Sequence, residues 1–249
     1  MTDARIAETF TLPSHGKIYE EEVNPEIILS SMTTKHEMLR LSTSEDSNRL
    51  MADIIDDCIQ SDVGISAYDM CLADYQYLMY KLREVTFGNE YEMIGVCPYC
   101  GNREDISVDL DELEIKEFTE DILDMMEITL PVSGDEIEIT MQTPRSLDDT
   151  ARQVKQARRK LKNKENPEIL YVMLNSIIRK NGEDFSPIEE ELWLRNLPLA
   201  DTNAILASID RLNTSFGMDL TVYHTCSNCG QEFVAPFRVN DSFFRPSVF

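Results

Sequence analysis

The sequence of 249 residues predicts an α+β fold. Apolar residues recur with helical spacing in the N-terminal third and again from residue 146 to about residue 216. Alternating runs, which are typical of strands, surround two Cys-x-x-Cys pairs and form a hairpin pattern between them. No internal repeat or low-complexity linker separates these parts, so we expect them to pack together.

The composition excludes two classes of partner. The chain has 46 acidic against 23 basic residues and a formal net charge of −23, which repels nucleic acid and anionic membranes. No run of about 18 apolar residues occurs, and the first ten residues are mixed and polar. Six cysteines are too few for a disulfide scaffold in a chain of this length. We therefore expect a soluble protein of a reducing cytoplasm.

Residues 1–90 are expected to form an extended arm followed by helices. Pro and Gly in "TFTLPSHGKIYEEE" predict an arm with a turn at Ser14–Gly16 that pairs with or lies across another element. Thr34 and Glu37 have the spacing of a capping box and predict a helix start. Further helices are predicted by two apolar faces, and Gly88 is the predicted stop. The faces comprise Leu50, Ile54, Ile55 and Cys58, and then Cys71, Tyr75, Leu78 and Leu82.

Two matched cysteine pairs provide the most specific chemical pattern. "CPYCG" contains Cys97 and Cys100, and "CSNCG" contains Cys226 and Cys229. Each pair follows a predicted strand, ends in Gly and precedes another strand, which is the pattern of the two knuckles of a zinc ribbon. The four thiolates would complete a closed tetrahedral site for a structural Zn²⁺. Residues 101–225 separate the pairs, so we expect an insertion whose two ends return to the same place.

Other interpretations of the cysteines remain open. A redox dithiol favours a helix N-terminus for its first cysteine, whereas these pairs follow β-rich runs. Unmetallated buried thiols are a second alternative, because cysteine is common in protein cores. His224 could replace one ligand, although a strand residue is the simpler interpretation. Cys58 and Cys71 lie on apolar helix faces and are interpreted as core residues.

Four parts follow from these patterns. They are residues 1–90 (arm and helical unit), 91–110 with 217–240 (zinc ribbon), 111–216 (inserted hairpin and helical region) and 241–249 (aromatic tail). In the insertion, the alternating runs 127–132 and 136–143 predict a hairpin with its turn at Ser133–Asp135.

A basic helix and the aromatic tail are candidate partner-binding segments. Residues 152–164 contain seven Lys and Arg residues, including Arg158 and Arg159, and would form either a solvated helix face or a docking patch for an acidic partner. Phe243, Phe244 and Phe249 would either contact a partner or another copy of the chain, or fold back to close the core of their own chain.

The sequence contains no pattern of a common enzyme family. It lacks the phosphate-binding loop, the H-E-x-x-H zinc-protease motif, the nucleophile elbow and the dinucleotide-binding glycine motif. Its acidic clusters are most simply solvated faces. We expect a protein that is not an enzyme and has no catalytic residues.

Taken in order, the motifs resemble one family nearly end to end. These motifs are "LPSHGKIY", "MTTKHEMLRL", "LADYQYLMYKLREVTFGNEY", "CPYCG" with "VDLDEL", the hairpin, "LPLADTNAILASIDRLN", "CSNCGQEF" and "FFRPS". Together they are similar to the baseplate hub assembly proteins of T-even-type contractile-tailed bacteriophages. The chain length is also similar to that of the hub-assembly member.

The resemblance implies a function that the residues alone do not. It implies a non-enzymatic assembly factor, or chaperone, that binds other baseplate hub proteins in the cytoplasm of the infected cell and is absent from the mature virion. A structural zinc-containing subunit that stays in the virion is the alternative. A homo-oligomer is compatible with either function.

Overall fold

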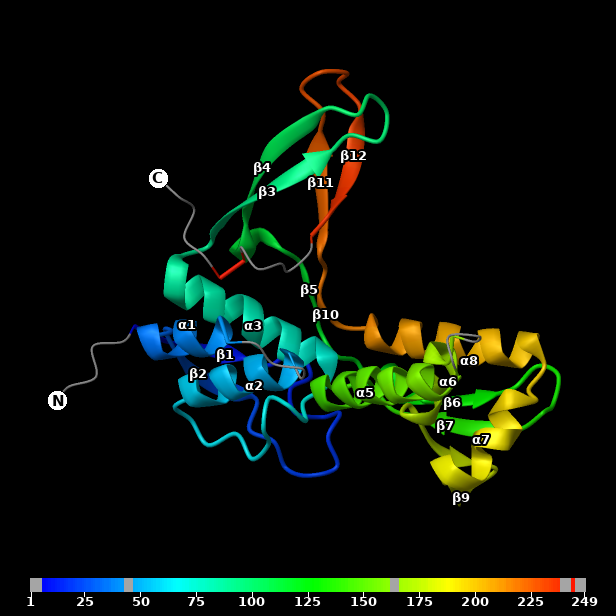
Figure 1. Cartoon of the computed structure of the whole chain (residues 1–249). Helices are drawn as coiled ribbons and strands as arrows, with labels where there is room; N and C mark the ends of the chain where they lie inside the picture. The colour runs from blue at the N-terminus through cyan, green and yellow to red at the C-terminus, as the bar shows by residue number, and fades with distance from the viewer. Residues whose placement is uncertain (1–5, 43–46, 162–165, 238–242, 245–249) are drawn as a thin grey trace.

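The computed structural model describes residues 6–42, 47–161, 166–237 and 243–244, with the backbone alone at residues 160, 161 and 236. Helices and small antiparallel sheets form three parts (Figure 1). A helical lobe comes first in the chain, a narrow arm of two hairpins stands above it, and a second lobe lies beside it. The predicted α+β class is confirmed.

The N-terminal lobe combines a two-stranded sheet with three helices. These elements are β1 (Ala7–Thr11), β2 (Glu26–Ser30), α1 (Thr34–Arg40), α2 (Ser47–Cys58) and α3 (Leu72–Phe87). The extended N-terminal segment that the sequence predicts therefore pairs with another strand, since β1 and β2 form an antiparallel pair. Its turn places His15 and Gly16 at positive φ, and a Cβ at Gly16 would lie 2.5 Å from the Val23 carbonyl oxygen.

The helix starts and stops are largely those that the sequence predicts. Gly88 ends α3 at φ 85°, as expected. The start of α1 differs by one residue: Thr33 is the N-cap, and its backbone N–H donates to Nδ1 of His36, 3.0 Å away. The predicted capping pair of Thr34 and Glu37 is therefore wrong, because the imidazole of His36 takes the position expected for a carboxylate.

The arm consists of two antiparallel hairpins that are distant in sequence. Its strands are β3 (Glu90–Val96), β4 (Arg103–Asp109), β11 (Thr221–Thr225) and β12 (Glu232–Pro236). A short 3₁₀ turn, η1 (Leu110–Glu112), ends the first hairpin. Gly95 lets the hairpins approach each other, because an added Cβ would lie 2.4 Å from Cδ1 of Ile106 and 3.6 Å from Cζ of Phe233.

The second lobe is an insertion between the two hairpins. It contains α4 (Asp121–Asp124), β6 (Glu127–Thr129), β7 (Glu136–Ile139), α5 (Pro144–Leu161), α6 (Glu168–Leu174), β8 (Ile177–Lys180), β9 (Glu183–Asp184), α7 (Pro187–Arg195) and α8 (Leu199–Asn213). The predicted hairpin is present, with strands shorter than expected. It belongs to a four-stranded sheet of order β6-β7-β8-β9, whose last two strands lie where the sequence predicted helix.

The ends of this insertion meet at the base of the arm. The strands β5 (Ile115–Lys116) and β10 (Gly217–Met218) pair antiparallel, with Gly217 opposite Lys116. Lys116 also forms an ion pair with Asp219, at 2.8 Å. The expectation that the insertion returns to its starting place is confirmed.

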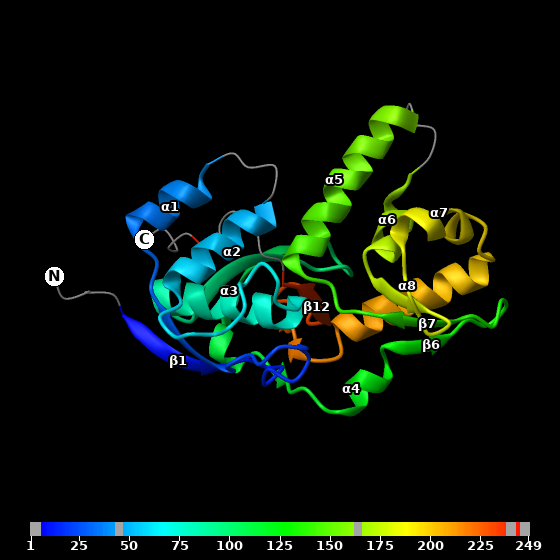
Figure 2. The ribbon, with the colours of Figure 1, turned by 90° about the horizontal axis from the view of Figure 1, so that it is seen from below.

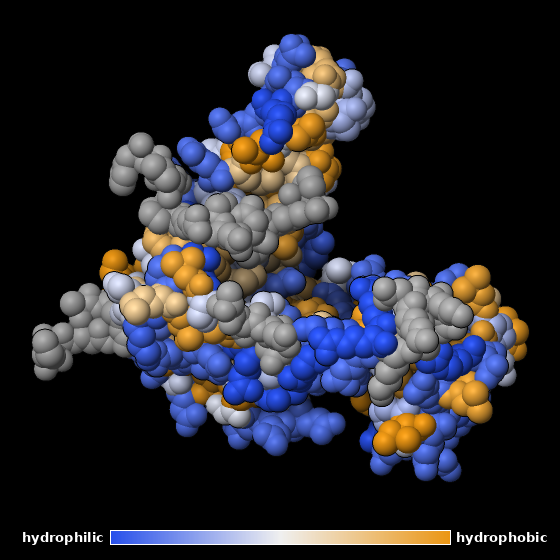
Figure 3. All heavy atoms as spheres, in the orientation of Figure 1, coloured by the Kyte–Doolittle hydropathy of each residue, from blue (hydrophilic) through white to orange (hydrophobic). Residues whose placement is uncertain are grey.

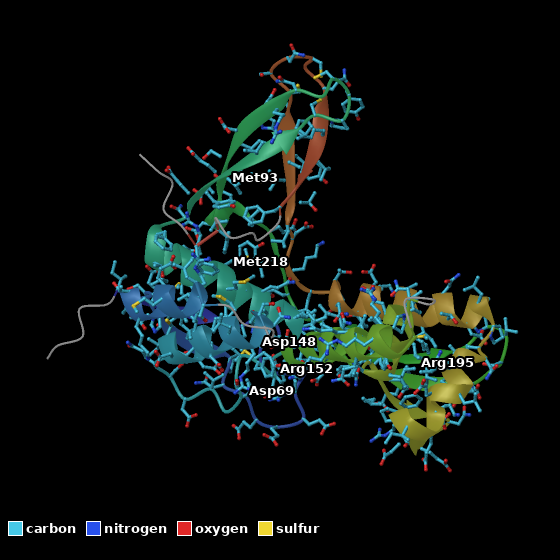
Figure 4. The ribbon with its side chains drawn as sticks, viewed as in Figure 1. Asp69, Met93, Asp148, Arg152, Arg195 and Met218 are labelled. Atoms are coloured by element: carbon cyan, nitrogen blue, oxygen red, sulfur yellow. The ribbon has the colours of Figure 1, made fainter. Side chains whose placement is uncertain are left out.

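Polar contacts also join the second lobe to the first. Asp148 of α5 is buried and accepts hydrogen bonds from the Asn48 side chain, the Arg49 backbone and the Tyr68 hydroxyl, at 2.8, 2.9 and 3.2 Å. Arg145 binds the carboxylate of Asp69 with two nitrogens. Figure 4 shows Asp148 and Asp69 where α5 meets the N-terminal lobe.

Two separate hydrophobic cores stabilise the molecule. The first contains residues of the N-terminal lobe and of the arm together, such as Leu78 and Phe233. The second lies mainly in the second lobe, where it includes Ile139 and Ile205, and it also contains Cys71 and Ala73 from the start of α3. Tyr19 contacts both cores. The arm therefore shares its core with the N-terminal lobe, and the core of the second lobe is closed by the first turn of α3.

Candidate metal centre

The tips of the two hairpins position the four predicted cysteines. In the first hairpin Val96 pairs with Arg103, and in the second Thr225 pairs with Glu232. Each turn therefore begins with a cysteine directly after the last paired residue of the incoming strand. The two turns lie next to each other at the end of the arm in Figure 1.

The two turns have the same backbone hydrogen bonds. Cys97 donates its N–H to the Asn102 carbonyl at 2.9 Å and accepts from the Gly101 N–H at 2.9 Å. Cys226 makes the equivalent bonds with Gln231 and Gly230, at 3.0 and 2.9 Å. The two glycines adopt φ values of 72° and 71°, where a side chain would be strained. The matched sequences thus fold into matched knuckles.

These knuckles bring all four sulfur atoms together. The sulfur atoms of Cys97, Cys100, Cys226 and Cys229 all lie within 4.8 Å of one another. The Cys97–Cys229 and Cys100–Cys226 sulfur distances are 3.7 and 3.6 Å, far longer than a disulfide bond of about 2.05 Å. The first cysteine of each pair is buried, and the second is more exposed. The cluster could hold a metal ion.

The thiol of Cys100 has a lowered pKa. The side chain of Asn228 hydrogen-bonds to the Cys100 sulfur, and this contact is the main reason that the pKa of Cys100 is lowered to about 6. A thiolate, rather than a thiol, is the metal ligand. The lowered pKa favours the thiolate form of Cys100, the form that binds a metal.

Glu104 of β4 ties the first hairpin to the second knuckle, and sequence reasoning missed it. Its carboxylate accepts from the Ser227 backbone and hydroxyl at 2.8 Å, from Asn102 at 2.7 Å and from Nε2 of His224 at 2.7 Å. Its pKa is lowered to about 2, first by the Ser227 hydroxyl and then by His224. His224 is thus a strand residue paired with a carboxylate, and it is not a member of the cysteine cluster.

Comparison with known proteins identifies the family. The model of the family described as T4 bacteriophage base plate protein matches residues 5–245. The chain belongs to this family. Searches of curated proteins and of solved structures give no match. Within the described part of this baseplate-family chain, no helix is long and apolar enough to cross a membrane.

The two described phenylalanines of the tail lie in the core of their own chain. Phe243 and Phe244 are 0% and 4% exposed. The Phe243 ring stands edge-on to Tyr80 and Tyr91, with centroids 5.0 and 5.3 Å away. Of the two interpretations of these rings, their burial in the first core favours the one in which the tail folds back to close the core of its own chain. Phe249 lies outside the described residues.

The predicted basic helix is α5, and its C-terminal half extends from the body of the protein (Figure 2). Its inner face is packed, since Val154 and Ala157 are buried. Arg158 is exposed, donates to the Asn166 side chain at 3.0 Å and lies 3.7 Å from Glu168. Arg159 is exposed and has no ion pair with a described residue. The helix therefore presents positive charge on a protein of net charge −23.

Proposed function

We propose that this baseplate-family protein is a non-enzymatic assembly factor for the central hub of the phage tail baseplate. The family match over residues 5–245 carries the proposal. The order of the motifs, which is similar to that of the hub-assembly member, supports this function within the family. The missing catalytic motifs also favour a protein that acts by binding. Its clients would be other hub proteins in the host cytoplasm.

The four clustered cysteines would hold one structural Zn²⁺. Zinc–sulfur bonds of about 2.3 Å place the sulfurs of a regular tetrahedron about 3.8 Å apart, close to the observed 3.6 and 3.7 Å. Four sulfur ligands fill the coordination shell, so the zinc would cross-link the two hairpins in a zinc ribbon. Glu104 would keep the knuckles together beside the ligands.

Metal analysis tests the identity of the ion. We expect one zinc per chain in purified protein, measured by plasma mass spectrometry, and a colourless solution. A tetrahedral site of four sulfurs also accepts iron. A red protein with one iron per chain would therefore refute zinc while keeping the metal centre.

The fate of the protein during phage assembly tests the function. An assembly factor is present in infected cells and missing from finished particles. We expect mass spectrometry of purified virions to detect other baseplate proteins but not this chain, and deletion of its gene to leave hubs unassembled. A fixed, symmetric copy number in virions would support the alternative, a structural subunit. Hydrolysis of cell-wall material or of hub proteins by the purified protein would refute the non-enzymatic function.

A further inference from the structure

The outer end of the second lobe exposes an unusual group of apolar side chains. Val132, Ile188, Leu192 and Leu199 are 60%, 91%, 70% and 73% exposed, and we call this surface the α7–α8 corner. Figure 3 shows hydrophobic residues at this end of the molecule, and Figure 4 places Arg195 of α7 there. Clustered apolar exposure of this kind marks an interaction site more often than an ordinary surface.

A hollow of about 510 Å³ lies at this corner, and Leu192 is the one of the four side chains that lines it. Val132 directly precedes the lining residue Ser133, and Leu199 directly follows the lining residue Pro198. Ile188 lies one helical turn before Leu192 on α7. The other lining residues are Ser133, Glu189, Trp193, Asn196, Leu197 and Pro198. The hollow therefore has a mixed lining, with Leu192, Trp193 and Leu197 as its apolar part, contributed by a hairpin turn on one side and by α7 with its link to α8 on the other.

Buried polar contacts hold the two sides of this hollow in place. The Asp201 side chain of α8 is fully buried and accepts the backbone N–H groups of Val132 and Ser133, at 2.8 and 2.9 Å. Asp135 accepts the indole N–H of Trp193 at 3.2 Å. The Lys180 ammonium lies 4.5 Å from the Trp193 ring centroid. The surface is thus preorganised, which lowers the free-energy cost of binding.

The backbone around the hollow has few donors left for a partner strand. The N–H groups of residues 132–135 bind Asp201, Leu130 and Ser133, and those of Asn196 and Leu197 bind within the end of α7. Pro198 has no N–H. Addition of a strand needs free main-chain groups, whereas a helix contributes only side chains. The corner therefore suits an amphipathic helix.

The charges around the corner indicate the sign of its partner. Of the six acidic residues in 183–201, Asp201 is buried and bonded to backbone N–H groups, and Asp184 lies 3.6 Å from Arg179. Glu190 pairs with Lys180 and Glu191 with Arg195, whereas Glu189, which lines the hollow, has no ion pair with a described residue. Complementary charges around an interface steer association and select partners. A partner with Lys or Arg beside its apolar stripe fits this corner.

We propose that the α7–α8 corner binds an amphipathic helix of another protein, with an apolar stripe flanked by basic residues. The partner's large apolar side chains would enter the hollow beside Trp193, and its basic residues would face Glu189. This inference rests on the proposed function in one respect: we expect the helix to belong to a hub protein. It assigns the client-binding surface to a lobe that the metal centre does not reach.

The single tryptophan of the chain makes the test direct, because Trp193 lines the hollow. The probe is a synthetic helical peptide of about 18 residues, with leucines on one face and lysines beside them. Titration should change the intrinsic fluorescence of the full-length protein. The double variant Leu192→Ala with Leu199→Ala should weaken binding about tenfold. Met38→Ala, at an equally exposed position (71%) on α1, is the matched control and should leave binding unchanged.

Three results would overturn the proposal. The first is that Met38→Ala weakens binding as much as the double variant does. The second is that a peptide with glutamate in place of lysine binds equally well. The third is that the wild-type protein is a dimer which the double variant converts to monomers, because the corner would then bind a second copy of the chain. Complementation in infected cells distinguishes a failure of the proposed binding surface from a failure of the proposed function. If the double variant still supports hub assembly, the corner is not the client site and the proposed function stands.

Discussion

The arm and the second lobe solve the same structural problem by different means. The second lobe packs around a large core of aliphatic and aromatic side chains, to which α3 adds Cys71 and Ala73. The arm consists of two hairpins, each too small to be stable alone, whose tips meet at four cysteines. Small β units of this kind depend on metal or disulfide cross-links. A metal bound at the four cysteines, as proposed, would therefore stabilise the arm more than the second lobe.

Removal of a metal ligand should have the largest effect. Cys97→Ser should abolish stoichiometric zinc binding and unfold the arm, because structural zinc contributes about 10–16 kcal/mol in small zinc domains. Hydrogen exchange should become fast in β3 and β11 while β7 and α8 stay protected. Tyr99→Ser, at an exposed position (65%) in the same knuckle, is the control. An unchanged melting temperature with zinc retained in Cys97→Ser would disprove the metal centre.

Shortening a side chain in the second core should destabilise the protein without loss of zinc. Ile205 is fully buried in α8, and Ile205→Ala should destabilise the protein by about 2–5 kcal/mol through the cavity that it leaves. Denaturant unfolding would measure the loss, and metal analysis of the still-folded protein should find unchanged zinc. Loss of zinc at low denaturant would show that the two parts are more strongly coupled than their separate cores suggest.

The tail should behave as part of the first core. Phe243→Ala removes a ring that is 0% exposed and lies against Tyr80, and it should cost about 3–5 kcal/mol. Deletion of residues 243–249 should lower the melting temperature of the isolated protein for the same reason. A truncated protein with the wild-type melting temperature that fails only in hub assembly would restore the interface interpretation.

Much of this architecture could be predicted from the sequence because it depends on local patterns. Helical spacing located α3 and its end at Gly88, and two matched Cys-x-x-Cys-Gly turns located the cluster. Features set by distant contacts could not be predicted in this way. Glu104 is one acidic residue among 46, and only the packing of two distant hairpins shows its role. β8 forms because β7 is beside it, and the burial of Phe243 depends on the aromatic rings of other elements.

The ion pair where the second lobe meets the base of the arm should contribute less to stability, and its contribution should depend on pH. Lys116 lowers the pKa of Asp219 to about 2 through their ion pair. A lowered carboxyl pKa contributes stability that is present above about pH 4 and is lost as the pH falls toward 2. Both side chains are partly exposed, so Asp219→Asn should cost less than about 1 kcal/mol at neutral pH. An NMR titration of the Asp219 carboxyl checks the pKa, and a value near 4 would disprove the pairing.

Charge reversal on α5 should have the smallest effect on stability and a separate effect on binding. Arg158→Glu with Arg159→Glu changes exposed side chains, so the free energy of unfolding should change by less than about 1 kcal/mol. If the helix binds an acidic partner, the same double variant should reduce hub assembly in infected cells, because complementary charge controls association rates. Arg211→Glu, on the exposed side of α8, tests for a general effect of added negative charge. Normal assembly with the double variant would leave α5 as a solvated helix and the α7–α8 corner as the stronger candidate for client binding.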